Sequence, residues 1–145
     1  MGSGQFGCND DVTVWNRWRN PETGKDEWYR HILPVKCKWK THANRDVSGG
    51  TANIANSIVL VVPYSETYFK PQEWAVLDVA GKARFFTLKS GDLAALGKQE
   101  VEITGIRPST EAEIKKILLP DVMTIDTVAD NTRSAMGKHF KAEGV

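Results

Sequence analysis

Alternation of apolar and polar residues is the main pattern along this chain, and it predicts short β-strands. Residues 11–18 alternate in this way, and the Pro- and Gly-containing segment 20–25 that follows is typical of a tight turn. A second alternating stretch occupies 27–40. The two stretches predict a β-hairpin, with a bend or a sheet edge at Pro34, which has no N–H to donate.

The rest of the chain adds further short strands and one helix. The wholly apolar, β-branched run at 57–63 is typical of a central strand. Thr110, followed three residues later by Glu113, forms a capping box that predicts a helix over 108–119, which Pro120 ends. Shorter apolar or alternating segments predict strands at 83–88, 93–96, 99–104, 121–128 and 138–142.

Two long connections separate these elements. The segment 41–56 is polar with two glycines in its middle, which predicts a long loop. The segment 64–82 is irregular but aromatic, so we expect it to pack against other parts of the protein. Together the elements predict a mainly β fold, a small β-barrel or sandwich of seven to eight short strands with one short helix and long loops.

The length of 145 residues fits one domain, which we expect to span 10–145 after a flexible, Gly-rich tail at 1–9. The longest apolar run is far shorter than the roughly 20 residues of a membrane-spanning helix. The first residues lack the pattern of a secretory signal. Cys8 and Cys37 are too few for a disulfide framework. These features favour a cytosolic origin and no contact with a membrane.

Charge changes this picture only locally. The chain has 19 Lys and Arg against 18 Asp and Glu, which disfavours a basic surface over the whole molecule. Lys36, Lys38 and Lys40 nevertheless alternate along one face of a predicted strand, with Arg45 nearby. Such a stripe can contact DNA or an acidic partner, or it can be a solvated face whose lysines protect a sheet edge. Both interpretations stay open.

Five tryptophans are many for this length, and four of them precede residue 40. Trp15, Trp28 and Trp39 fall in predicted strands, so we assign them mainly to the core, with Trp18 at the end of the hairpin. Trp74 stands apart in the segment 64–82. We expect Trp74 to contact a neighbouring subunit, because aromatic residues are enriched at protein interfaces.

The candidate catalytic residues do not form a recognisable set. His31 lies among apolar neighbours, and His42 lies in a polar segment. Cys37 alternates with apolar residues, which indicates a buried, inert thiol, and it has no cluster of further ligands at zinc spacing. We expect no enzymatic activity, metal, cofactor or small-molecule substrate. A small nuclease that uses His31 or His42 with a nearby Glu is the alternative.

Six segments resemble, in order and spacing, a family of small tailed-bacteriophage proteins. The segments lie at 12–17, 20–21, 28–30, 87–92, 123–133 and 139–144, and 87–92 has the sequence Thr-Leu-Lys-Ser-Gly-Asp. That family is catalogued as of unknown function, among the head and head–tail genes of phages and prophages. The chain departs from its pattern at Thr132, within an Asp-Asn-Arg turn, and at Phe140, where Trp is usual.

The resemblance implies a virion structural protein. Proteins of this kind form rings in the neck, so we expect a six- or twelve-fold homo-oligomer at the head–tail junction, made in the host cytoplasm. Its expected partners are the portal or adaptor, tail proteins and packaged DNA. The stopper, or head-closure, role is the first choice, and a tail-terminator or tail-completion role is the alternative within the neck. A small nucleic-acid-binding β-barrel is a third interpretation.

The candidate contact residues follow from these expectations. We expect subunit contacts at Tyr68, Phe69, Trp74, Asn44 and Arg45, all in the two long connections. The candidates for contact with DNA in the channel or with an acidic partner are Lys36, Lys38, Lys40 and Arg45.

Overall fold

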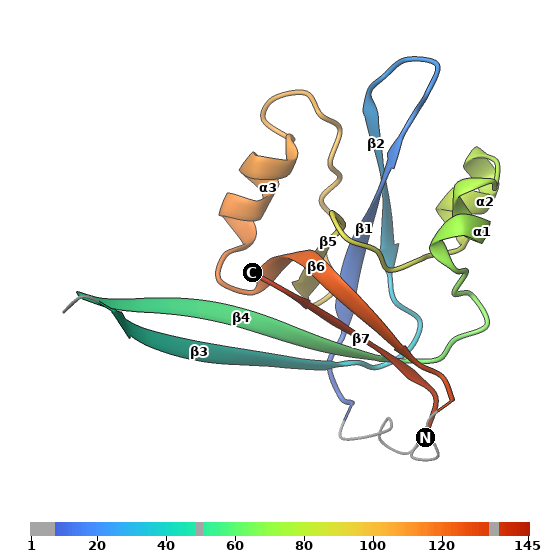
Figure 1. Ribbon diagram of the computed structural model, residues 1–145. Helices are drawn as coiled ribbons and strands as arrows, with labels where there is room; N and C mark the ends of the chain where they lie inside the picture. The colour runs from blue at the N-terminus through green and yellow to red at the C-terminus, as the bar shows by residue number, and fades with distance from the viewer. Residues whose placement is uncertain (1–7, 49–50, 134–136) are drawn as a thin grey trace.

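In the described part of the chain, seven strands form one antiparallel sheet flanked by three short helices (Figure 1). The computed structural model describes residues 8–48, 51–133 and 137–145, and for 42–48 and 51–56 it describes the backbone alone. The strands are β1 (Val12–Arg19), β2 (Asp26–Ile32), β3 (Lys38–Ser48), β4 (Thr51–Pro63), β5 (Leu93–Leu96), β6 (Val122–Asn131) and β7 (His139–Gly144). The helices are α1 (Pro71–Ala75), α2 (Val79–Arg84) and α3 (Glu111–Leu118).

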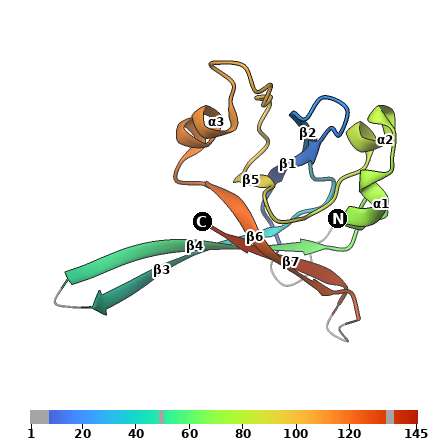
Figure 2. The ribbon, with the colours of Figure 1, turned by 45° about the horizontal axis from the view of Figure 1, so that its top comes forward.

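The strand order is β2-β1-β5-β6-β7-β4-β3, so β2 and β3 are the edges of an open sheet. The mainly β class is confirmed, but the expected barrel or sandwich is wrong. One bridge, between Asp10 and Cys37, joins the chain before β1 to the chain before β3, with N–H···O distances of 2.8 and 2.9 Å. The ladder does not continue from this bridge, because β3 and β4 extend away from β2 in both views (Figures 1 and 2).

Two apolar clusters form the core, and β1 contributes to both. Val12 and Val14 belong to the larger cluster. Other members of this cluster are Ile58, Leu60, Met123, Ile125 and Phe140. Trp15 belongs to the smaller cluster with Ile114 of α3, and its indole N–H donates to the backbone oxygen of Val101 at 2.9 Å. The alternation of residues 11–18 thus corresponds to a strand buried on both faces.

A buried polar network holds the turn before β5 against β1. The carboxylate of Asp92 is fully buried, and it accepts from the backbone N–H of Arg17 at 2.9 Å and from the side-chain amide of Asn16 at 2.8 Å. It also pairs with the ammonium of Lys89. The Asn16 side chain in turn binds both backbone groups of Thr87, at 2.7 and 3.1 Å. Burial raises the pKa of Asp92, while Lys89 and the hydrogen bonds oppose that rise.

The segment 41–56, predicted as a long loop, is instead the greater part of a hairpin. β3 and β4 pair in continuous register from Lys38↔Val61 to Ser48↔Thr51. The prediction was wrong because it relied on apolar residues, and a two-stranded ribbon that projects from the core does not need them. The predicted strand 27–40 is divided around Pro34 into nearly all of β2, up to Ile32, and the start of β3 at Lys38. Of the predicted tail, 1–7 lie outside the described residues, and Cys8 is buried.

The predicted strands 83–88 and 99–104 are also wrong, and the expected single helix becomes three. Residues 83 and 84 belong to α2, which begins where the Asp78 carboxylate accepts from the backbone N–H of Gly81 at 2.7 Å. The segment 99–104 runs beside β1 without ladder pairing, and the Gln99 N–H donates to the Thr13 hydroxyl at 2.9 Å. The segment 64–82 therefore includes α1 and the start of α2.

The predicted helix over 108–119 is confirmed as α3. The Thr110 hydroxyl accepts from the backbone N–H of Glu113 at 3.3 Å and donates to its carboxylate at 2.8 Å. Ile114 is buried against the sheet, whereas Ile117 is 70% exposed. The capping box therefore determines where α3 begins, and the burial of Ile114 determines which face of α3 lies against the sheet.

Gly144 leads to a first prediction, because β6 and β7 converge there without room for a side chain. A Cβ atom at this position would lie 2.0 Å from the backbone oxygen of Thr124. We expect Gly144→Ala to lower the free energy of unfolding by about 2–4 kcal/mol, since the backbone must move. Urea denaturation measures the loss. The exposed neighbour provides a control, Glu143→Ala, which should change stability by no more than about 0.5 kcal/mol. An unchanged Gly144→Ala would contradict the close approach.

Candidate functional site

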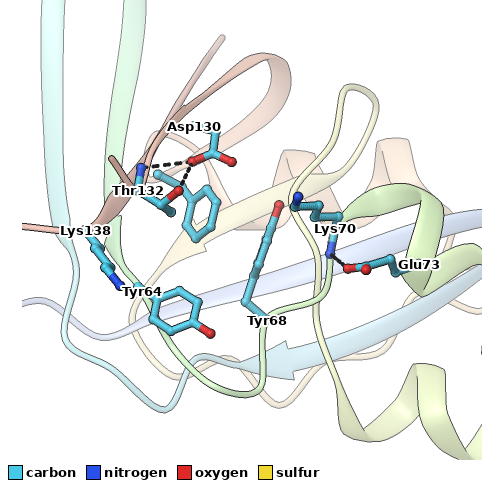
Figure 3. Close-up of a pocket in the computed structure, with 8 residues that line it drawn as sticks. Tyr64, Tyr68, Lys70, Glu73, Asp130, Thr132 and Lys138 are labelled. Carbon is cyan, nitrogen blue, oxygen red and sulfur yellow. Dashed lines mark hydrogen bonds between the residues drawn. The ribbon is translucent and has the colours of Figure 1, made fainter. Parts of the chain in front are cut away.

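A hollow of about 310 Å³ lies between the chain that leads from β4 to α1 and the β6–β7 hairpin (Figure 3). We call it the Tyr68 pocket. Its lining residues are Tyr64, Tyr68, Lys70, Glu73, Asp130, Thr132, Lys138 and Phe140. An adjoining hollow of about 270 Å³ shares Tyr68, Lys70, Asp130 and Phe140 with the Tyr68 pocket.

The rings of Tyr64, Tyr68 and Phe140 form the apolar part of the Tyr68 pocket. The rings of Tyr68 and Phe140 lie 4.1 Å apart between centroids at an angle of 32°. Tyr68 also meets the edge of Phe86, with centroids 5.6 Å apart. Burial raises the pKa of the Tyr68 hydroxyl, which therefore stays protonated. Tyr64 is 48% exposed, and the Lys138 ammonium lies 6.0 Å from its ring centroid.

The charged side chains at the rim of the Tyr68 pocket balance one another. Asp130 accepts from the backbone N–H and the hydroxyl of Thr132 at 2.9 and 2.7 Å, and these bonds lower the pKa of its carboxyl group. Glu73 accepts from the backbone N–H of Lys70 at 3.3 Å (Figure 3). The rim of the pocket thus carries two lysines, Lys70 and Lys138, and two carboxylates, Glu73 and Asp130. This arrangement suits a planar or apolar group with a polar end, such as a side chain of a partner protein, better than it suits a phosphate.

The structure separates the three lysines of the predicted stripe. Lys36 precedes β3, and its ammonium lies 2.6 Å from the carboxylate of Asp11. Lys38 and Lys40 lie in β3, the edge strand. The side chains of Asn44 and Arg45 lie outside the described residues, although their backbones pair with Ala55 and Ile54 in β4. The stripe therefore consists of two lysines on one strand and a third that is paired elsewhere.

The aromatic residues predicted at a subunit contact differ in burial. Tyr68 lies in the Tyr68 pocket, and Phe69 is half-buried and stacks on Phe85 with ring centroids 4.6 Å apart. Trp74 is fully buried in its own chain, so its predicted contact with a neighbouring subunit is wrong. Its indole N–H donates to the backbone oxygen of Phe85 at 2.8 Å, and Tyr29 meets it edge-on with ring centroids 5.7 Å apart.

Comparison with known proteins gives one family. The sequence model of a family of unknown function (DUF6751) matches residues 7–145. The chain belongs to this family. No curated protein and no solved structure matches it. Since the match covers nearly the whole chain, the open sheet with its three helices belongs to a DUF6751 domain.

Sequence reasoning missed two arrangements in this DUF6751 chain. The Tyr68 pocket combines residues of 64–73 with residues of 130–140, which only the fold brings together. Lys82 is the second case, because its ammonium is buried, lies 4.3 Å from the centroid of a Trp18 ring and donates to the backbone oxygen of Ala75 at 3.0 Å. This lysine fastens the α1–α2 segment to β1. A lysine at the end of an irregular, aromatic segment gives no indication of such a contact.

The predicted catalytic candidates have environments that disfavour acid–base chemistry near neutral pH. His31 is 8% exposed, and burial lowers its pKa to about 4. Burial raises the pKa of the Cys37 thiol to about 12. The side chain of His42 lies outside the described residues. In the described ranges no group of three or more His, Cys, Asp or Glu side chains could hold a metal ion, and none of the helices there is long and apolar enough to cross a membrane.

His31 gives a prediction for the dependence of stability on pH. Its pKa is about 4 in the folded chain and near 6.5 when the chain is unfolded, so the unfolded state takes up the proton first as the pH falls. The contribution of His31 is therefore fully present above pH 6.5 and is lost between pH 6.5 and 4. We expect a loss of roughly 2–3 kcal/mol in unfolding free energy between pH 7.5 and 4.5 from this group.

The variant His31→Leu isolates this contribution. The Nε2 atom of His31 is buried without a hydrogen-bond partner among the described residues, so an apolar side chain of similar size should be tolerated at pH 7.5. Urea denaturation of both proteins across this range should show a flatter pH profile for the variant. Parallel profiles for the two proteins would contradict a neutral, buried His31.

Proposed function

We propose that this chain is a structural protein of a tailed-bacteriophage virion and forms a ring in the neck between the portal or adaptor and the tail, in the role of the stopper that closes the head. The observation that carries the proposal is a projecting ribbon of two strands. We call residues 42–48 of β3 and 51–57 of β4 the arm (Figures 1 and 2).

The arm has no support from the rest of the described chain. β4 pairs with β7 only from Ile58↔Gly144 to Pro63↔His139. The seven pairs beyond, from His42↔Ser57 to Ser48↔Thr51, have no other described strand beside them. An isolated two-stranded hairpin is at best marginally stable in water. The arm is therefore suited to lie on another molecule, and in a ring each arm can reach the next subunit.

The resemblance to phage neck proteins supports the same function. Two of the segments that carry it are parts of the framework: 87–92 is the turn held by the Asn16 network, and 139–144 is β7, which ends at the base of the arm. A likeness that falls on framework residues is consistent with a structural protein. At the other end of β7, the Tyr68 pocket offers an aromatic recess for a side chain of a neighbouring neck or tail protein.

The nucleic-acid-binding alternative has less support. Lys36 is paired with Asp11, which reduces its availability for phosphate. Trp39, the aromatic residue between Lys38 and Lys40, is partly buried and packs against the larger core cluster. A base would have to stack on a ring that is already in contact with the protein.

Deletion of the gene from its phage or prophage tests the proposed function. We expect particles to fail at head–tail joining, with heads and free tails seen separately by electron microscopy of the lysate. Addition of the purified chain should restore infectious particles, and mass spectrometry of these particles should find about six or twelve copies each, as a cyclic ring requires.

The same lysates separate the candidate roles. Heads that lose their DNA indicate the stopper, whereas stable filled heads beside tails of irregular length indicate a tail terminator. Complementation by the native gene in trans is the control. Tailed, infectious particles at normal yield without the gene would contradict a neck function of either kind.

A further inference from the structure

The charged groups of the Tyr68 pocket differ in how firmly they are held, and the carboxylates are the fixed ones. The backbone N–H and the hydroxyl of Thr132 both donate to the Oδ1 atom of Asp130. The backbone N–H of Lys70 donates to the Oε1 atom of Glu73. Each carboxylate keeps a second oxygen that accepts no hydrogen bond from the described residues. The pocket therefore presents acceptors that are oriented before any ligand arrives.

The two lysines at the rim are less constrained than the carboxylates. Lys70 and Lys138 are both exposed, and neither ammonium has a hydrogen bond or an ion pair to a described residue. The Lys138 ammonium lies 6.0 Å from the centroid of the Tyr64 ring, at the outer limit of a cation–π contact. Long, exposed lysine side chains can turn into solvent when a ligand enters. Because fixed groups lose less freedom on binding than mobile ones, the oriented carboxylates favour a cationic ligand.

The charges that act inside the pocket also favour a cation. Burial is the main cause of the raised pKa of the Tyr68 hydroxyl, and the negative charges of Asp130 and Glu73 add to that rise. Figure 3 shows these two side chains on opposite sides of Tyr68. The hydrogen bonds from Thr132 hold the pKa of Asp130 below its ordinary value, so this carboxylate is ionised throughout the neutral range. A cation that enters beside Tyr68 therefore meets a permanent negative charge next to an aromatic ring.

We propose that the Tyr68 pocket binds an arginine side chain of a partner protein. A guanidinium stacks on aromatic rings while it donates in its own plane to a carboxylate, a combination that the compact ammonium of lysine lacks. Tyr64 and Tyr68 supply the rings, Asp130 supplies the oriented acceptor, and Glu73 adds a second negative charge. The inference deepens the proposed function, on which it rests only for the source of the arginine, a neighbouring neck or tail protein.

The adjoining hollow of about 270 Å³ indicates what lies beside this arginine in the partner. Beyond the residues that it shares with the Tyr68 pocket, this hollow is lined by Pro71, Gln72, Leu88 and Val128. Three of these four side chains are apolar, so the hollow suits an aliphatic side chain. We therefore expect the partner segment to carry an aliphatic residue next to the arginine.

An acidic side chain is the opposite occupant, because Lys70 and Lys138 also line the pocket. Such a side chain would enter beside an ionised Asp130, and two carboxylates that share a site repel each other. It would also gain nothing from the faces of the aromatic rings, which carry negative charge density. The experiment below includes this occupant as one of its outcomes.

Titration of the purified chain with blocked amino acids, followed by NMR, tests the proposal. Acetyl-argininamide should shift the backbone amide resonances of 64–73, 128–132 and 138–140, with a dissociation constant of about 1–10 mM for a single side chain. Acetyl-lysinamide should bind about threefold more weakly or less, because it has no planar group. Acetyl-glutamic acid amide should shift none of these resonances. A blocked dipeptide of arginine and leucine should bind more tightly than one of arginine and serine.

Two variants then assign the binding to the pocket. Asp130→Asn removes the charge but keeps an acceptor for Thr132, and we expect it to weaken binding of acetyl-argininamide by about tenfold or more. Asp126→Asn is the matched control, because Asp126 is an exposed carboxylate of the same strand that lines neither hollow. It should leave the affinity unchanged. Tyr64→Leu removes an exposed ring and should weaken binding by roughly threefold.

The same titrations can overturn the proposal. Equal binding of the arginine, lysine and glutamic acid amides would do so, because it would show no preference for a guanidinium. Arginine binding that is unchanged in both Asp130→Asn and Tyr64→Leu would place the binding elsewhere. Shifts of the pocket resonances by the glutamic acid amide alone would assign the pocket to an acidic side chain and would also overturn the proposal.

These outcomes are separate from those that test the proposed function. Arginine binding by a chain that is absent from virions would support the pocket and refute the neck function. A chain that is present in the neck but does not bind acetyl-argininamide would refute the pocket and leave the neck function standing.

Discussion

The buried hydrogen bonds among Asn16, Thr87 and Asp92 are the constraint on which the arrangement of the sheet depends. A buried carboxylate is unfavourable unless its oxygens are fully bonded, and Asp92 meets this condition through donors from β1 and from its own turn. Since β5 begins at the next residue, the position of Asp92 sets β5 between β1 and β6. A strand of only four residues could not specify that place through its own ladder.

Strand β1 takes part in most of the stabilising contacts described above. The larger core cluster includes Val12 and Val14 of β1, the Asn16 network joins β1 to the turn before β5, and Lys82 contacts Trp18 of β1. The two strands of the arm, by contrast, pair with each other and with no third strand of the described chain. The chain buries its apolar residues in the sheet, whereas the arm projects from it. This form is expected of a subunit whose packing is completed on assembly.

Local pattern was sufficient for the elements that are stabilised locally. β1 follows from strict alternation, and α3 follows from the capping box at Thr110 and Glu113. The arm was missed because its polar residues lack alternation, and its strands are defined by pairing with each other. Trp74 was misplaced because its irregular segment gave no indication of α1, which turns the indole into the protein. The Tyr68 pocket could not be predicted from local pattern either, because its lining residues come from two segments that are distant in the sequence.

The position of Gly144 links the rigid part of the sheet to the arm. Gly144 pairs with Ile125 of β6 and with Ile58 of β4, and it approaches the backbone oxygen of Thr124 too closely to admit a side chain. Between Ile58 and Pro63, β4 therefore lies between β3 and β7, and both of its edges are paired. Between Thr51 and Ser57 it pairs with β3, and no third strand of the described chain joins the ladder there. The pair between Ile58 and Gly144 is thus the boundary between the part of β4 that belongs to the sheet and the part that belongs to the arm.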